Sequence, residues 1–157
     1  MDQDQELQVE ITELSAQPVM AIRAQTTKSG VPDLLRDLLP EVSKYLDEQG
    51  VHPTGPPFAR WFRFEDEGVD VQAGMPVSGP IAGKDRITAG ELPGGQVAMA
   101  WHTGPYDTLS ETYERLHDWI HGQGRDDSEA PWEVYWTDPE ETPDSSQWRT
   151  QIVWPLS

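Results

Sequence analysis

Apolar residues recur at helical spacing in two segments of the chain, residues 31–49 and 107–121. In each segment they fall three or four positions apart, and a glycine follows the last one. The positions are Leu35, Leu39, Val42 and Leu46 in the first segment and Leu109, Tyr113, Leu116 and Ile120 in the second. The pattern predicts two amphipathic helices, and Thr108 and Glu111 have the spacing of a capping box at the start of the second.

Shorter runs with β-branched and aromatic residues surround these helices and are separated by Gly, Pro and Asp. They are LQVEITEL, PVMAIRAQ, FARWFRF, VDVQAGMPV, QVAMAWH, WEVYWT and WRTQIVWPL. Strands on either side of two helices predict a fold of the α+β class. We expect a single domain over residues 1–157, with a flexible stretch at residues 1–6.

The two halves of the chain share a pattern at an offset of 74 residues. The offset relates the helix-face positions given above and also relates Gly30 to Gly104, Gly50 to Gly124, Pro57 to Pro131, Phe58 to Trp132 and Phe62 to Trp136. The match predicts two βαββ units, over about residues 7–77 and 96–156. We expect the units to pair about a pseudo-twofold axis, with two main helices on one face of an antiparallel sheet and a ligand cleft between the repeats.

Glu133 stands in an aromatic segment, WEVYWT, that is typical of a strand. Alternation places Trp132, Val134 and Trp136 on one face and Glu133 with Tyr135 on the other. The aromatic face is predicted to be core. Glu133 is then either solvated surface or part of a binding site.

The repeat register favours the binding site. It aligns Glu133 with Ala59 and Tyr135 with Trp61. We expect these four side chains to point away from the helices and to converge on the cleft. The side chains expected beneath the helices are Phe58, Phe62, Phe64, Trp132 and Trp136.

The composition is strongly acidic, with 11 Lys and Arg against 28 Asp and Glu and a formal net charge of −17. Such a surface repels nucleic acids and anionic membranes, so we expect no direct contact with either. The charge either serves solubility, attracts cations or imitates DNA. The chain has no cysteine, no apolar run of about 18 residues and no signal-peptide pattern, and we expect it to be cytoplasmic.

Four other features bear on the chemistry of the chain. His117 and His121 have the spacing of a helical metal pair, but they lack a glutamate after the first histidine and a third ligand, so neither a metal nor a cofactor is expected. His102 either reaches the cleft or satisfies backbone groups, and Trp101 belongs either to the cleft or to the core. Arg149 falls in the same hairpin as Glu133, where pairing would neutralise the carboxylate.

The segments ELPGGQVAMAWHTGPYDTL, WEVYWTDPEE and WRTQIVWPL, with GPPFARWF and VDVQAGMPV in the first half, resemble gyrase-inhibitor-like effector-binding domains. Such domains also occur fused to AraC-type and MerR-type regulators. The resemblance extends from Leu7 to Leu156 and implies two βαββ units and an aromatic-walled cleft with one glutamate at its base. Glu133 matches that glutamate, Trp61 a usual aromatic position, and Tyr106 the tyrosine of the family's GPY motif.

The resemblance implies a stand-alone protein that binds aromatic or lipophilic, cationic small molecules for drug sensing or sequestration. The expected ligand-binding residues are Glu133, Tyr135, Trp61, Ala59, Tyr106, Trp101 and His102. One alternative is a hydrolase of strained electrophilic natural products that uses Glu133 and Tyr106 as catalytic residues. A second alternative is a gyrase-binding or DNA-mimicking inhibitor, whose protein partner would be gyrase or a regulator.

Overall fold

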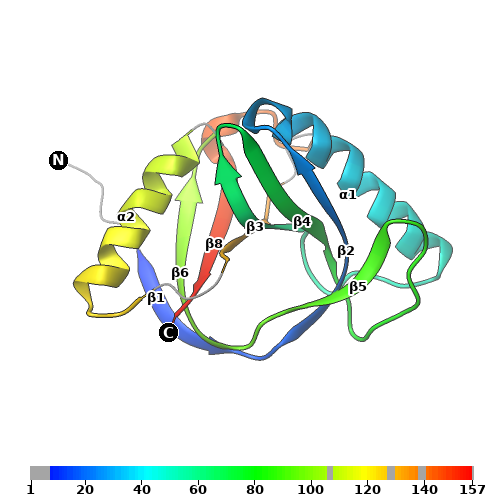
Figure 1. Cartoon of the computed structure of the whole chain (residues 1–157), viewed down its shortest axis with the longest axis horizontal. Helices are drawn as coiled ribbons and strands as arrows, with labels where there is room; N and C mark the ends of the chain where they lie inside the picture. Colours follow the sequence, from blue (N-terminus) through cyan, green and yellow to red (C-terminus); the bar gives the residue numbers. More distant parts are fainter. Residues whose placement is uncertain (1–7, 106–107, 127–129, 138–140, 157) are drawn as a thin grey trace. The chain divides into compact units, whose positions relative to one another are not determined.

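The structure, a computed structural model, describes residues 8–105, 108–126, 130–137 and 141–156. Within these residues the chain forms eight strands and two α-helices, which confirms the α+β class. Figure 1 labels both helices and most of the strands. The chain divides into two compact units. Unit 1 comprises residues 1–14 and 95–157, and unit 2 comprises residues 15–94.

Unit 2 contains an antiparallel sheet with the strand order β3-β4-β2-β5. Its strands are β2 (Gln17–Thr26), β3 (Phe58–Glu65), β4 (Gly68–Pro76) and β5 (Ile87–Leu92). Helix α1 (Val31–Glu48) contacts β2 and β4. The helix starts with a proline in its first turn and is followed by Gly50 at a φ of 70°, a backbone conformation that glycine adopts without strain. The helix residues that it buries are Leu38, Val42, Tyr45 and Leu46.

In unit 1 the antiparallel strands have the order β1-β6-β8-β7. Its strands are β1 (Val9–Leu14), β6 (Gly95–Thr103), β7 (Trp132–Tyr135) and β8 (Arg149–Pro155), and its helix is α2 (Leu109–Gly122). Helix α2 packs on the sheet through a buried cluster. The cluster consists of Ala98, Ala100, Leu109, Leu116, Ile120 and Ile152.

Both units contain a strand, a helix and a hairpin in that order, β2-α1-β3-β4 and β6-α2-β7-β8. The remaining strand of each unit does not pair with the strand that follows it in the sequence. Strand β1 precedes β2 but pairs with β6, and strand β5 precedes β6 but pairs with β2. The order of elements is that of the predicted βαββ unit. An origin by duplication stays a prediction.

The alternation of β3 is interrupted by a bulge that the sequence pattern did not reveal. Trp61 pairs with Val71, but the register with β4 shifts before Arg63, so Phe62 is the extra residue. Beyond the bulge the faces are reversed, and Phe64 lies on the face of Trp61, with ring centroids 5.3 Å apart. Phe62 and Phe64 are 37% and 52% exposed, so the prediction that they lie beneath a helix is wrong.

Strand β5 is a second feature that the pattern missed, since ITAGEL is rich in small and polar residues.

Within the part of the chain that the structure describes, no helix is long and apolar enough to cross a membrane.

Candidate functional site

The strand register of unit 1 fixes the direction of the Glu133 side chain. Glu133 pairs with Ile152 across β7 and β8, and Ile152 pairs in turn with Ala100 of β6. Directly paired residues share a face of the sheet, and Ile152 and Ala100 belong to the cluster that packs against α2. Glu133 and Tyr135 therefore face α2. The prediction that they point away from the helices is wrong in unit 1.

Glu133 is buried, with 4% of its surface exposed. The hydroxyl of Tyr113, on α2, donates a hydrogen bond of 2.7 Å to Oε2 of Glu133. The hydroxyl of Tyr135 donates a second one of 2.9 Å to Oε1. We call these three residues the tyrosine–glutamate cluster. Each carboxylate oxygen thus has a neutral donor, which offsets part of the cost of removing the charge from water.

Tyr113 is held in its protonated form by this environment. Burial raises its pKa well above the ordinary value, and the negative charge of Glu133 raises it further. The hydroxyl therefore remains a hydrogen-bond donor throughout the neutral range. The Tyr113 ring packs edge-on against Trp154 of β8, with centroids 5.8 Å apart.

Two of the predicted ligand-binding residues lie in unit 2. Ala59 is fully buried and pairs with Ala73, and Trp61 is half-buried on the same strand. Their place beside Glu133 stays a prediction. Tyr106 lies outside the described residues.

His102 is buried at the end of β6 and connects this strand to the start of α2. Its Nδ1 lies 2.8 Å from the hydroxyl of Thr112, and its Nε2 lies 3.0 Å from the carbonyl oxygen of Pro105. These contacts favour the prediction that His102 satisfies backbone groups over the prediction that it reaches a cleft. The Thr108 hydroxyl donates to the same carbonyl and makes no capping bond to α2, so the predicted capping box is wrong.

The face of the unit 1 sheet opposite α2 carries the half-buried Trp101 and the exposed Trp136. The ring centroids of Trp101 and Trp136 are 6.0 Å apart, and the guanidinium of Arg149 lies 4.3 Å from the Trp101 centroid. Trp136 is 53% exposed, so its predicted place in the core is wrong. Because Arg149 points to this face, it lies on the opposite side of the sheet from the carboxylate of Glu133.

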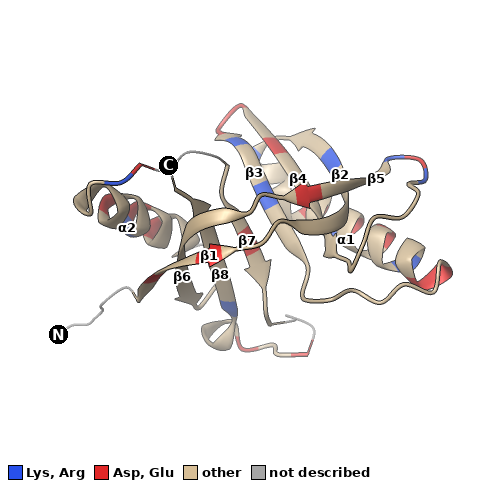
Figure 2. Ribbon diagram, turned by 90° about the horizontal axis from the view of Figure 1, so that it is seen from below, with Lys and Arg blue, Asp and Glu red and all other residues tan. Residues whose placement is uncertain are grey.

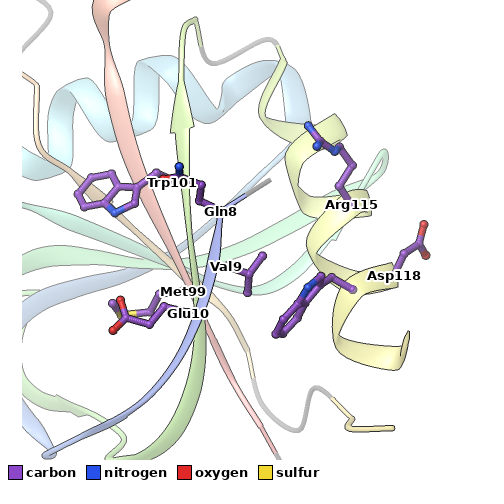
Figure 3. Close-up of a pocket in the computed structure, with 8 residues that line it drawn as sticks. Gln8, Val9, Glu10, Met99, Trp101, Arg115 and Asp118 are labelled. Carbon is purple, nitrogen blue, oxygen red and sulfur yellow. The ribbon is translucent and has the colours of Figure 1, made fainter. Parts of the chain in front are cut away.

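A broad open pocket of about 990 Å³ lies along the edge of the same sheet. It is lined by Gln8, Val9, Glu10, Met99, Trp101, Arg115, Asp118 and Trp119. Figure 3 shows Trp101 and Met99 on one side of β6 and Arg115 and Asp118 on α2 on the other. The polar groups do not converge on one point, and Glu133 is not among the lining residues. The tyrosine–glutamate cluster is therefore the stronger candidate site.

A family model for the GyrI-like small molecule binding domain matches residues 7–157. The chain belongs to the GyrI-like family. The predicted resemblance is thereby confirmed, and this GyrI-like chain is a small-molecule-binding domain. Comparison with curated proteins gives no sequence match.

Solved structures share the fold of this GyrI-like domain. The EcmrR C-terminal domain matches with a TM-score of 0.85 and 22% identity, over 96% of this chain and 98% of that chain. In the cryo-EM structure of an EcmrR–DNA complex the match has a TM-score of 0.85 and 21% identity and covers 96% of this chain and 57% of the EcmrR chain. SAV2435 bound to tetraphenylphosphonium matches with a TM-score of 0.69 and 13% identity, over 98% and 94% of the two chains. A hydrolase from Listeria innocua matches with a TM-score of 0.67 and 13% identity, over 95% and 91%.

Tyr113 is the residue of this GyrI-like site that sequence reasoning missed. It was assigned to the apolar stripe of α2, where its ring does pack against the core cluster. One signal could have identified it: in that stripe of four residues, only Tyr113 carries a polar group. A buried tyrosine hydroxyl requires a hydrogen-bond partner, and Glu133 supplies it.

Proposed function

We propose that this GyrI-like domain binds lipophilic organic cations and that the tyrosine–glutamate cluster recognises their charge. The observation that carries the proposal is the buried carboxylate of Glu133, which accepts one tyrosine hydroxyl on each oxygen. Two neutral donors fix the position of the carboxylate but do not cancel its charge. The negative charge of this carboxylate attracts a cation, and the attraction is strong where little water is present.

The cluster suits a cation whose charge is delocalised or shielded. Coulomb attraction is stronger where little water is present, and the faces of aromatic rings add a favourable cation–π term. The rings of Tyr113, Tyr135 and Trp154 are all half-buried and provide such faces. The neighbour SAV2435 was solved with tetraphenylphosphonium, a cation of this chemical kind, which supports the proposal.

The hydrogen bonds also predict which cations are disfavoured. A primary ammonium group needs acceptors for three donors, and it would compete with Tyr113 and Tyr135 for the oxygens of Glu133. A phosphonium or quaternary ammonium ion has no N–H donor and leaves both hydroxyls in place. We therefore expect quaternary ions to bind better than primary amines of equal size.

A pair of ions with the same shape tests the proposal. Tryptophan fluorescence titrations should show tighter binding of tetraphenylphosphonium than of tetraphenylborate, and the seven tryptophans make the signal practical. Glu133→Gln should weaken cation binding by more than about tenfold, which corresponds to roughly 1.4 kcal/mol.

Glu10→Gln is the matched control, because Glu10 is exposed on β1 and the substitution removes the same amount of net charge. It should leave the affinity unchanged. Circular dichroism should first establish that both variants are folded. Equal affinity for the two ions, or an unaltered affinity in Glu133→Gln, would contradict the proposal.

The cluster also supports a second candidate function, hydrolysis of a strained electrophilic ring. Glu133 could accept a proton from an attacking water, and Tyr113, whose pKa is raised, holds a proton on the adjacent hydroxyl. Incubation with such substrates and detection of products by mass spectrometry tests this function. Glu133→Gln should then lower turnover by about a hundredfold while binding of the neutral substrate persists. Ligands recovered unchanged would exclude turnover for the compounds tried.

A further inference from the structure

The exposed surface of α2 carries two histidines one helical turn apart, His117 and His121. Their ring centroids are 4.3 Å apart and their planes are inclined by 41°. The side chains are 48% and 44% exposed. Residues four positions apart lie on the same side of a helix, so both imidazoles are accessible to one bound ion.

Each histidine has a carboxylate beside its Nδ1 atom. Oδ1 of Asp118 lies 3.8 Å from Nδ1 of His117, and Oδ1 of Asp126 lies 3.7 Å from Nδ1 of His121. Both distances are within the range of an ion pair and beyond that of a direct hydrogen bond. A carboxylate on one ring nitrogen is the usual arrangement of a metal-binding histidine, because it leaves the other nitrogen for the metal.

We propose that His117 and His121 bind one divalent transition-metal ion through their Nε2 atoms, with Asp118 and Asp126 orienting the rings. The sequence showed only the spacing of the two histidines. The structure adds a carboxylate near each Nδ1 atom and the close approach of the two rings. Among the described residues, no group of three or more His, Asp or Glu is placed to hold a metal, so the proposed site has two protein ligands. Imidazole ligands favour Cu²⁺ over Zn²⁺ and both over Mg²⁺ and Ca²⁺.

The charge of the helix assists this binding. Figure 2 shows acidic bands along α2. The acidic residues in the sequence of this helix are Glu111, Glu114 and Asp118. Together with the formal net charge of −17, they raise the concentration of cations near the surface. The proposed metal site uses residues outside the tyrosine–glutamate cluster, and it can exist whether or not that cluster binds organic cations.

Calorimetric titration with copper(II) chloride and zinc chloride tests the proposal, on full-length protein from which any purification tag has been removed. We expect one ion per chain, with Cu²⁺ bound more tightly than Zn²⁺. His117→Ala and His121→Ala should each weaken binding by at least about tenfold, and Asp118→Asn by about tenfold. His52→Ala is the matched control, since His52 is the exposed histidine of unit 2, and it should leave binding unchanged.

Thermal unfolding gives a second measurement that does not depend on heats of binding. At a metal concentration 100 times the Kd, the Tm of the wild-type protein should rise by about 5 °C or more. His117→Gln and His121→Gln, which keep a polar side chain on the helix surface, should lose this rise and keep the Tm of the metal-free protein. Equal affinity in the wild type and the two histidine variants would overturn the proposal, and so would the absence of binding at millimolar metal.

Discussion

The two faces of the unit 1 sheet place aromatic side chains beside opposite charges. On the α2 face, the hydroxyls of Tyr113 and Tyr135 donate to the buried carboxylate of Glu133. On the other face, the ring of Trp101 lies under the guanidinium of Arg149 at the surface. The first charge is held by hydrogen bonds away from water, whereas the second remains in contact with solvent.

Electrostatic effects should be large on the α2 face and small on the other face. A buried charge is costly when its partners are removed, because water does not replace them. An exposed charge is screened, and loss of its partner is largely compensated by hydration. Substitutions on the α2 face should therefore change stability and binding more than substitutions on the other face.

The largest effect is expected from a core deletion on the α2 face. Leu116 is fully buried in the cluster beneath α2, and Leu116→Ala should lower the free energy of unfolding by about 2–5 kcal/mol. Trp136→Ala removes a larger side chain from the opposite face, yet we expect a change within about 1 kcal/mol because half of that side chain is exposed. Urea denaturation measures both. A Trp136→Ala effect as large as that of Leu116→Ala would show that the second face is a core.

A smaller effect is expected from removal of one hydroxyl. Tyr113→Phe keeps the ring that packs on Trp154 but removes the donor to Oε2 of Glu133, and should lower the free energy of unfolding by about 1–3 kcal/mol. In the Glu133→Gln background the same change should have less effect, since the charged acceptor is already gone. A double-mutant cycle in urea measures this coupling. Independent effects of the two substitutions would contradict the proposed cluster.

Alkaline pH should weaken the α2 face in a predictable direction. The pKa of Tyr113 in the folded protein is raised, by burial first and by the charge of Glu133 second, whereas in the unfolded chain it is about 10. The folded state therefore keeps a proton that the unfolded state loses. The resulting stability is fully present below pH 10 and is lost as the pH rises above it, by about 1.4 kcal/mol per pH unit until the folded pKa is reached.

Urea denaturation between pH 8 and pH 11 measures this dependence. Tyr113→Phe removes the titrating group and should show a shallower decline than the wild type over the same range. If the two proteins decline in parallel, then Tyr113 does not carry the effect.

Much of the fold could be predicted because its signals are local. The stripes of α1 and α2 and most strands follow from periodicity, and Leu116 and Ile120 are buried as their spacing requires. Strand β5 could not be predicted from its composition, because it is a strand through its pairing with β2. The bulge at Phe62 was hidden for the same reason, because a register shift is defined by the partner strand.

The candidate site could be predicted only in part. Alternation correctly places Glu133 and Tyr135 on one face of β7 and Trp132 on the other. It does not show which face a helix covers, because that depends on the pairing of Ile152 with Ala100 and on the packing of α2. The donor Tyr113 lies 20 positions from Glu133, and only the folded chain brings them together.

The smallest effect is expected from the exposed cation. Arg149→Ala removes the guanidinium that lies 4.3 Å from the Trp101 centroid, and should lower the free energy of unfolding by about 0.5–1 kcal/mol. Arg149→Lys keeps the charge but loses the planar stacking, so it should recover only part of this difference.

Thermal unfolding measures the stability, and tetraphenylphosphonium titration measures any effect on the other face. Because Arg149 and Glu133 lie on opposite faces of the sheet, the cation affinity of Arg149→Ala should stay within about threefold of the wild type, a change of less than roughly 0.7 kcal/mol. A larger change would show that the two faces are coupled through the sheet and would contradict their electrostatic separation.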